Sequence, residues 1–311
     1  MNKQYKENED KEVKQLNLFD NSSFEINSKI KEKLEKSTNL LDNMRVSPFL
    51  PIIKIDKKAP WFLKWEQDEY KLRRNTAWGY IEIRNRLLTQ KHKEVLNAIF
   101  CIGSENKSKR IKNNRLVIFF TIYELLAKLN LSSHGKNYKS IENIITEIKD
   151  TNIIRSATNL KDMYSIIEYV GIIKDDEYEA YGIRFSEEYT KRFTEDMTID
   201  ISKKFNALLS IKGEGAGLIK AIIDHFVSHK ASIERPVRYN LDNILIIINY
   251  VQEINKLKIK STLKKYKDSL LEYGIEFFAK EELFVYSGNI DIKQFPRLIE
   301  LQDKKTSKKN A

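Results

Sequence analysis

The spacing of apolar residues predicts one strand followed by three helices in the first half of the chain. The segment "AWGYIEIRNR" (77–86) alternates apolar and polar positions, as a strand does. The segments "TQKHKEVLNAIFCIG" (89–103), "TIYELLAKLNL" (121–131) and "YKSIENIITEIKD" (138–150) instead repeat at helical intervals. The second helix opens with Thr121 followed by Glu124, the spacing of a capping box.

Two β-rich runs follow these helices. They are "MYSIIEYVGIIK" (163–174) and "EYEAYGIRFS" (177–186), and the acidic residues between them indicate the turn of a hairpin. A further β-rich run, "LVIFF" (116–120), lies between the first two helices. The order of strand, three helices and hairpin is typical of a winged helix.

The same order returns after residue 196. The segment "MTIDI" (197–201) predicts a short strand, and "KIKSTLKKYKDSLLEY" (258–273) predicts a third helix with apolar residues at helical spacing. "IEFFAKEELFVYSG" (275–288) then predicts a second hairpin. The expected fold class is therefore α+β, with two tandem winged-helix domains. The expected parts are a flexible N-terminal tail (1–47), a first winged-helix domain with an N-terminal arm (48–195), a second winged-helix domain (196–292) and a basic C-terminal tail (293–311).

The charge of the chain suggests an acidic partner. The 311 residues carry a formal net charge of +11, which most often indicates nucleic acid. The excess comes from 42 lysines against 13 arginines, and a chain rich in Lys, Asn and Ile can also reflect an AT-rich genome. The position of the charge is therefore more informative than its total.

Cysteine content and hydropathy place the chain in the cytoplasm. The single cysteine, Cys101, forms no disulfide within the chain and is expected to be a buried thiol. The N-terminus has no signal-peptide core, and the longest apolar run, near Leu245 to Tyr250, is too short to span a bilayer. We therefore expect a soluble protein with no membrane partner.

The strongest candidate for DNA contact is "NKLKIKSTLKKYK" (255–267), which holds six lysines and no acidic residue. It occupies the third-helix position, which enters the major groove in helix-turn-helix proteins. Lysines would neutralise phosphates there, and Ser261 and Thr262 could bind phosphates or base edges. The alternative is a solvated lysine face on a surface helix. The candidate residues are Lys258, Lys260, Ser261, Thr262, Lys264, Lys265 and Lys267.

The equivalent helix of the first repeat begins with "HGKNYKSIEN" (134–143) and is a second, weaker candidate. Small polar and basic side chains near a helix N-terminus suit phosphate binding and base reading. The acidic residues Glu142 and Glu147 on the same helix weaken the charge signal. The candidate residues are Lys136, Asn137, Lys139, Ser140 and Asn143.

No segment indicates catalysis or a cofactor. His225 and His229 have helical i, i+4 spacing, but no further ligand has matching spacing, so no metal is expected. Gly213, Gly215 and Gly217 are not followed by the Lys-Ser/Thr of a phosphate loop and read as a flexible connector. We expect a protein that is not an enzyme.

Several of these segments resemble TrfA-type plasmid replication initiators. The likeness runs from about residue 75 to 290 through "WGYIEIRNR", "FTIYELLAKLNLSSHGKNYKSIENIITEIKDTNI", "IIDHFVSH" and "GIEFFAKEELFVY". The chain departs from the family in length around Ser261 to Tyr273, which leaves the DNA contacts of that helix open. The resemblance implies binding to repeated double-stranded sites (iterons) at a plasmid origin, opening of an adjacent AT-rich segment, recruitment of host initiation or helicase factors, and exchange between monomer and homodimer. Single-stranded origin DNA stays open as a further partner.

The N-terminal segment "QLNLF" (15–19) resembles the pentapeptide with which bacterial replication proteins bind the β sliding clamp, and TrfA-type initiators carry such a motif. Leu16, Leu18 and Phe19 would fill an apolar pocket, while Gln15 would supply hydrogen bonds. The alternative is that the three apolar side chains pack on this protein's own core.

Two other function classes compete with replication initiation. A winged-helix transcriptional regulator would bind DNA through the same helices, but it would gain nothing from a clamp-binding motif. A nicking enzyme would need paired histidines flanking an apolar residue, and the sequence has none.

Overall fold

The computed structural model describes residues 28–36, 38–40, 47–76, 79–157, 160–174, 179–195 and 198–288. These residues fall into two compact units. Unit 1 draws on Met1–Asn39, Val95–Asp150 and Tyr164–Ser202, and unit 2 on Leu40–Glu94, Thr151–Met163 and Lys203–Ala311. The chain is 45% helical and 26% strand, which confirms a mixed helix and sheet protein. The boundaries differ from the expected ones because each unit is assembled from separate stretches of chain.

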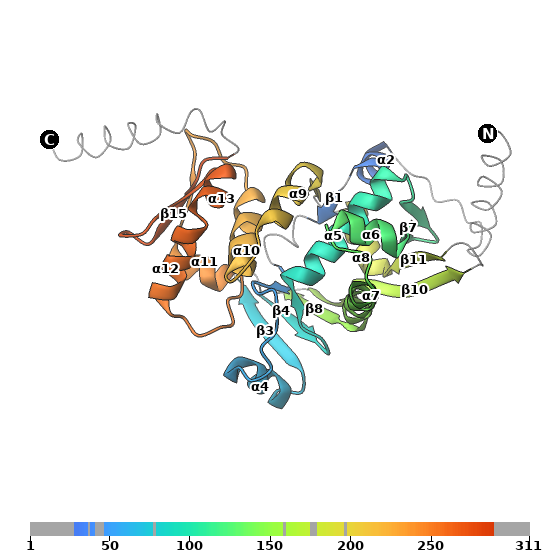
Figure 1. Ribbon diagram of the computed structural model, residues 1–311, viewed down its shortest axis with the longest axis horizontal. Coiled ribbons are helices and arrows are strands. Elements are labelled where there is room, and N and C mark those ends of the chain that lie inside the picture. The colour runs from blue at the N-terminus through green and yellow to red at the C-terminus, as the bar shows by residue number, and fades with distance from the viewer. Residues whose placement is uncertain are drawn as a thin grey trace. The chain divides into compact units, whose positions relative to one another are not determined.

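The helices and the second hairpin of unit 1 occur in the predicted order, but the strand predicted over 77–86 is β4 (Gly79–Arg84), which belongs to unit 2. Helix α5 (Gln90–Glu105) precedes a β6–β7 hairpin, helices α6 and α7 follow, and strands β10 and β11 form the second hairpin (Figure 1). The sheet has the strand order β10-β11-β7-β6, with antiparallel neighbours, and helix α8 comes after it. The bounds are β6 Arg110–Lys112, β7 Arg115–Phe120, α6 Ile122–Lys128, α7 Gly135–Asp150, β10 Ile167–Lys174, β11 Glu179–Phe185 and α8 Glu187–Glu195.

The predicted capping box at the start of α6 is confirmed. The Thr121 hydroxyl accepts a hydrogen bond from the Glu124 backbone N–H at 3.1 Å, and the Glu124 carboxylate accepts one from the Thr121 N–H at 2.7 Å. Both donors would otherwise be unsatisfied at the helix N-terminus. The box therefore fixes where α6 begins, directly after β7.

The β-rich run predicted over 163–174 does form strands, but it is divided between two different sheets. Its first residues belong to β9 (Leu160–Ser165), which lies next to β8 (Asn152–Ala157), and the remainder forms β10. The strand order of that other sheet is β3-β4-β8-β9. The backbone changes sheet at the fully buried Ile166, so a continuous apolar run hides the break.

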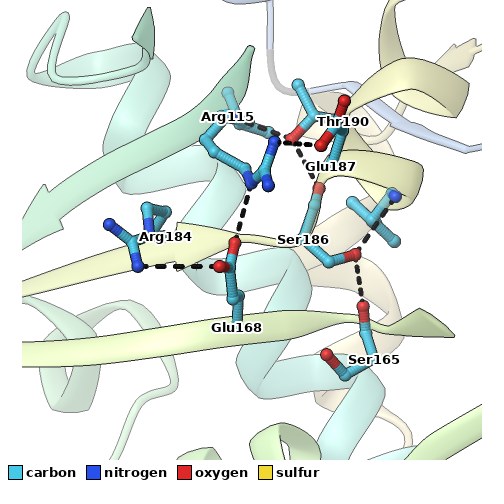
Figure 2. A network of polar contacts seen from close by, with 9 residues as sticks. Arg115, Ser165, Glu168, Arg184, Ser186, Glu187 and Thr190 are labelled. Carbon is cyan, nitrogen blue, oxygen red and sulfur yellow. Dashed lines mark hydrogen bonds and ion pairs between the residues drawn. The ribbon is translucent and has the colours of Figure 1, made fainter. Parts of the chain in front are cut away.

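Polar contacts join the second hairpin of unit 1 to β7 and α8 (Figure 2). Arg115 donates from Nε to Glu168 at 2.8 Å and from Nη1 to Glu187 at 2.8 Å, and Arg184 lies 3.6 Å from Glu168. The Ser186 hydroxyl donates to the Ser165 carbonyl at 2.6 Å. These contacts connect backbone segments and charged pairs, so we assign them a structural role.

Part of the segment expected to be a flexible tail is folded. Helix α2 (Ser28–Glu35) and strand β1 (Thr38–Leu40) belong to unit 1, where β1 pairs with β12 (Thr198–Asp200). Lys33 donates to the Phe193 and Thr194 carbonyls at 3.1 and 2.9 Å, at the end of α8. Lys109 donates in turn to the Lys33 and Lys36 carbonyls at the end of α2. Each lysine thus satisfies carbonyls that a helix C-terminus leaves free.

The arm packs in unit 2, although it was expected to pack on the first domain. Strand β2 (Phe49–Leu50) pairs in parallel with β5 (Leu88–Thr89), and α4 (Pro60–Gln67) lies against β3 (Lys71–Thr76). A Cβ placed on Gly217 would come within 2.7 Å of the Ile52 backbone. Only glycine permits this approach, which the sequence pattern alone does not reveal.

The C-terminal part of unit 2 repeats the order of unit 1. Helix α10 is followed by β13, helices α11, α12 and α13, and the hairpin β14–β15, with the sheet order β13-β15-β14. The predicted continuous helix over 258–273 is broken at Tyr266, whose hydroxyl donates to the Lys212 carbonyl at 2.6 Å. The bounds are β4 Gly79–Arg84, α9 Ser202–Ser210, α10 Ala216–Val227, β13 Val237–Asn240, α11 Leu241–Ile247, α12 Lys256–Lys265, α13 Lys267–Glu272, β14 Ile275–Phe278 and β15 Leu283–Tyr286.

Candidate nucleic-acid interface

Helix α7 presents a polar row to solvent, opposite an apolar face. Ile141, Ile144, Ile145 and Ile148 are buried, as the helical spacing predicts. Of the candidate residues, Lys136, Lys139 and Asn143 are exposed and Ser140 is half-buried. At 100° per residue these four positions lie within an arc of about 100° on the helix. The structure therefore brings four of the five candidates onto one face.

The fifth candidate on α7, Asn137, has a local structural role. Its side-chain amide donates to the backbone carbonyl of Ser132 at 2.9 Å and to the Ser132 hydroxyl at 3.0 Å. These bonds fix the turn that precedes the helix. Asn137 therefore supports the helix N-terminus and is not directed to a ligand.

Glu142 does not weaken the exposed row as much as the sequence suggests. Its carboxylate accepts a hydrogen bond of 2.6 Å from the Tyr181 hydroxyl, which lies 3.1 Å from the Tyr138 hydroxyl. Burial, together with the bond to Glu142, raises the pKa of Tyr181. The Glu142 carboxylate is therefore drawn toward β11, and the lysines face solvent.

Helix α12 has a clear division between its buried and exposed sides. Its N-cap is Asn255, whose side chain accepts a hydrogen bond from the Lys258 N–H at 3.0 Å. Ile259 and Leu263 are buried, at 2% and 1% exposure. The solvent row on the other side, defined as Leu257, Ser261 and Lys264, follows the i, i+4, i+7 spacing of one helix face.

Three lysines of the basic segment face solvent without an ion pair. Lys264, Lys265 and Lys267 are exposed, and no ion pair to any described residue is found for them. Lys265 lies 5.1 Å from the centre of the Tyr266 ring. These cations are available to a phosphate backbone.

The other lysines of the segment pair with carboxylates that lie far away in the sequence. Lys256 is 2.9 Å from both Asp242 and Glu282, and Lys260 is 2.7 Å from Glu282. The hydrogen bonds from Lys260 and Lys256 lower the pKa of Glu282. Lys260 is therefore partly neutralised, and Glu282, at the turn between β14 and β15, holds α12 in place.

Lys258 and Thr262 face the glycine-rich loop. Lys258 pairs with the exposed Glu214 at 2.9 Å, and the Thr262 hydroxyl donates to the Lys258 carbonyl at 3.0 Å. A Cβ on Gly215 would lie 2.3 Å from the Thr262 methyl group. Both side chains line a cavity of about 730 Å³ that also includes Trp61 of the arm. The prediction that Thr262 reads bases is therefore not supported by its position.

Sequence reasoning missed Leu257. This leucine is 82% exposed, in the first turn of α12 and between two lysines. It lies off the apolar stripe formed by Ile259 and Leu263, and that departure is the signal that could have identified it. Apolar side chains can contact the methyl group of thymine in the major groove.

The two histidines of the predicted i, i+4 pair lie close together on α10 and the turn after it. The Nε2 atoms of His225 and His229 lie 3.3 Å apart, and the His225 ring is buried. Within the described parts of the chain, no group of three or more His, Cys, Asp or Glu residues could hold a metal ion. Over those residues, no helix combines the length and apolarity needed to cross a bilayer.

The clamp-like residues Gln15, Leu16, Leu18 and Phe19 lie outside the described residues, as does the whole of the predicted basic C-terminal tail (293–311). Nothing in the described structure tests them.

No protein-family model matches the chain, and no curated protein matches it. Among solved structures, a selenomethionine crystal structure of domains 2 and 3 of RctB is similar, with a TM-score of 0.47 and 11% identity, over 71% of this chain and 91% of that one. A second crystal structure of RctB domains 2 and 3 gives a TM-score of 0.41 and 11% identity, over 73% and 93%. Likeness of this extent does not assign a function, so the residues themselves must support one.

Proposed function

We propose that this protein is a replication initiator that binds repeated double-stranded sites at a plasmid origin through two winged helices. The observation that carries the proposal is the exposed side of α12, where the solvent row lies beside the unpaired Lys265 and Lys267. The helix occupies the position that enters the major groove in helix-turn-helix proteins. Helix α7 presents a similar polar row from the equivalent position in unit 1.

The proposed mechanism uses binding energy and no catalytic centre of the protein's own. Lysines would release counterions from the phosphates, while the solvent row of α12 would contact base edges. Binding to successive repeats would strain and help open an adjacent AT-rich segment, where pyrimidine–purine steps deform easily. Host initiation or helicase factors would then load there.

Clamp binding is a separate part of the proposal and rests on the sequence of residues 15–19. Replacing Leu18 and Phe19 by alanine should abolish capture of the purified β sliding clamp and leave duplex binding unchanged. If the variant captures the clamp as well as the wild type, the motif has no such role.

Footprinting on the DNA of its own replicon tests the origin-binding proposal. At moderate salt we expect protection of tandem repeats, together with permanganate reactivity in the neighbouring AT-rich segment. Protection without such reactivity would favour a transcriptional regulator, which is the second candidate. The absence of any protected repeat would overturn the initiator proposal.

Paired substitutions test the role of α12. Changing Lys264 and Lys265 to alanine should reduce the slope of log affinity against log salt by about two, because about one counterion is released per phosphate contact. The control changes Lys57 and Lys64 to alanine, two exposed lysines outside α12. If the α12 variant and the control give equal slopes of log affinity against log salt, α12 does not contact the phosphates.

A further inference from the structure

The β3–β4 hairpin of unit 2 holds two arginines around one buried carboxylate. Glu82 is 2% exposed and lies opposite Arg73 in the strand register. One Glu82 oxygen accepts from Arg73 Nε at 2.9 Å and Nη2 at 2.8 Å, and the other accepts from Arg84 Nε at 2.6 Å and Nη2 at 2.5 Å. Arg73 also lies 4.1 Å over the Tyr80 ring.

The two arginines remain accessible although both are fixed. Their side chains are 55% and 37% exposed, whereas that of Glu82 is 3% exposed. A guanidinium carries five N–H groups, and Glu82 engages two on each arginine, so three on each stay outside this contact. The group as a whole keeps a charge of +1. The buried Glu82 thus holds the guanidinium groups of Arg73 and Arg84 on the same face of the sheet.

We propose that Arg73 and Arg84 bind the phosphate backbone of duplex DNA, as a contact separate from helices α7 and α12. The proposal rests on the proposed function, since it requires that the protein binds DNA. The guanidinium matches a phosphate bidentately, and a side chain that is already held in place loses little conformational freedom on binding. Phosphate contacts of this kind orient a protein on the duplex without reading its sequence.

The β3 strand supplies further polar groups to the same face. Alternate residues of a strand lie on the same face of the sheet. Lys71 and Asn75 therefore lie beside Arg73 on β3. Their partners on β4 are Arg84 and Tyr80. Lys71 pairs with the exposed Glu69. The net charge of this face is positive, as a phosphate contact requires.

Glutamine substitutions test the contact on duplex DNA, in the full chain. Arg73→Gln and Arg84→Gln should each lower the salt slope by about one and weaken binding about eightfold at 0.1 M salt. Arg86→Gln is the matched control, because Arg86 is exposed two residues after the end of β4 and outside the Glu82 contact. An equal loss in the control would show a general charge effect and overturn the proposal.

Arg73→Lys distinguishes recognition by the planar guanidinium from a general effect of charge. It also keeps the proposal testable if the glutamine variants fail to fold. The lysine keeps the charge and can still pair with Glu82, so the salt slope should stay near the wild-type value while the affinity falls. If this variant binds duplex DNA with wild-type affinity, bidentate phosphate binding by the Arg73 guanidinium is contradicted. If the Lys264/Lys265 variant loses affinity but all arginine variants bind normally, the arginine contact is wrong and the proposed function stands. If the wild type binds no duplex even at low salt, both are wrong.

Discussion

Among the described large apolar side chains that are exposed, Leu257 is the most exposed, and the proposed function gives it a partner. Fully burying a leucine stabilises a protein by about 1.5–3 kcal/mol, and this chain leaves Leu257 82% exposed beside lysines. The stabilisation becomes available when another molecule covers the leucine. Thymine methyl groups in a major groove fit this requirement, because the lysines beside it would meet the phosphates.

A methyl deletion in the DNA tests this role for Leu257. Replacing single thymines by deoxyuridine in a selected duplex should weaken binding by about 0.8 kcal/mol at the contacted position, or about fourfold in Kd. In Leu257→Ala this sensitivity should disappear, as measured by fluorescence anisotropy. Ser261→Ala is the control, since it leaves Leu257 in place. Equal thymine sensitivity in wild type and Leu257→Ala would contradict the contact.

Lys109 is a buried residue whose charge depends on pH near neutrality. Burial lowers its pKa to about 7, although Cys101 and Asp200 act in the opposite direction. From about pH 7 up to the ordinary value of 10.5, the unfolded chain keeps a proton that the folded chain releases. The free energy of unfolding should therefore rise with pH across this window, by up to about 1.4 kcal/mol per pH unit, and be lowest below pH 7.

Urea unfolding of the wild type and Lys109→Met at several pH values between 6 and 10 measures this effect. The free energy of unfolding of the wild type minus that of Lys109→Met should increase with pH, because only the wild type has the titrating amine. A pH-independent difference would show that Lys109 keeps its charge when folded.

At the scale of elements, local signals were the most predictable. Thr121 and Glu124 fixed the start of α6, and the isoleucines of α7 fixed its buried face, because these effects act within one or two helical turns. The break at Tyr266 depends on a hydrogen bond to Lys212, and the pairing of Lys256 and Lys260 depends on Glu282. These long-range partners could not be read from spacing, whereas the position of Leu257 off the apolar stripe could have been.

The α6 capping box makes a measurable contribution to stability. Thr121→Ala should lower the free energy of unfolding by about 1 kcal/mol, because the Glu124 N–H loses its acceptor. Thr146→Ala is the matched control, since Thr146 is exposed in the middle of α7 and its hydroxyl donates only to the Glu142 carbonyl. Chemical unfolding of both variants makes the comparison, and a larger loss in the control would contradict the role of the cap.

At the scale of the whole molecule, the units cannot be separated by cutting the chain once. The expected second domain, 196–292, lacks the arm and the β3–β4 hairpin that belong to the same unit. Its α10 would lose the close approach of Ile52 to Gly217. Sequence order alone suggested two consecutive domains, because contacts between distant stretches leave no periodic signal.

A fragment comparison tests this organisation. Residues 196–292 alone should unfold with low cooperativity and bind a hydrophobic dye, while addition of a separate fragment covering 47–94 should reduce dye binding. Cooperative unfolding of the 196–292 fragment on its own would show that the arm is dispensable.

Because the two units are built from alternating stretches of the chain, neither unit is complete until late in synthesis on the ribosome. Residues 40–94 of unit 2 are synthesised early, yet apart from residues 151–163 the rest of this unit begins only at Lys203, about 110 residues later. At about 5–20 residues per second, these residues would wait roughly 5–20 s for α10, whose Gly217 packs against the Ile52 backbone. The slower the translation through residues 95–202, the longer residues 40–94 would stay without the rest of their unit.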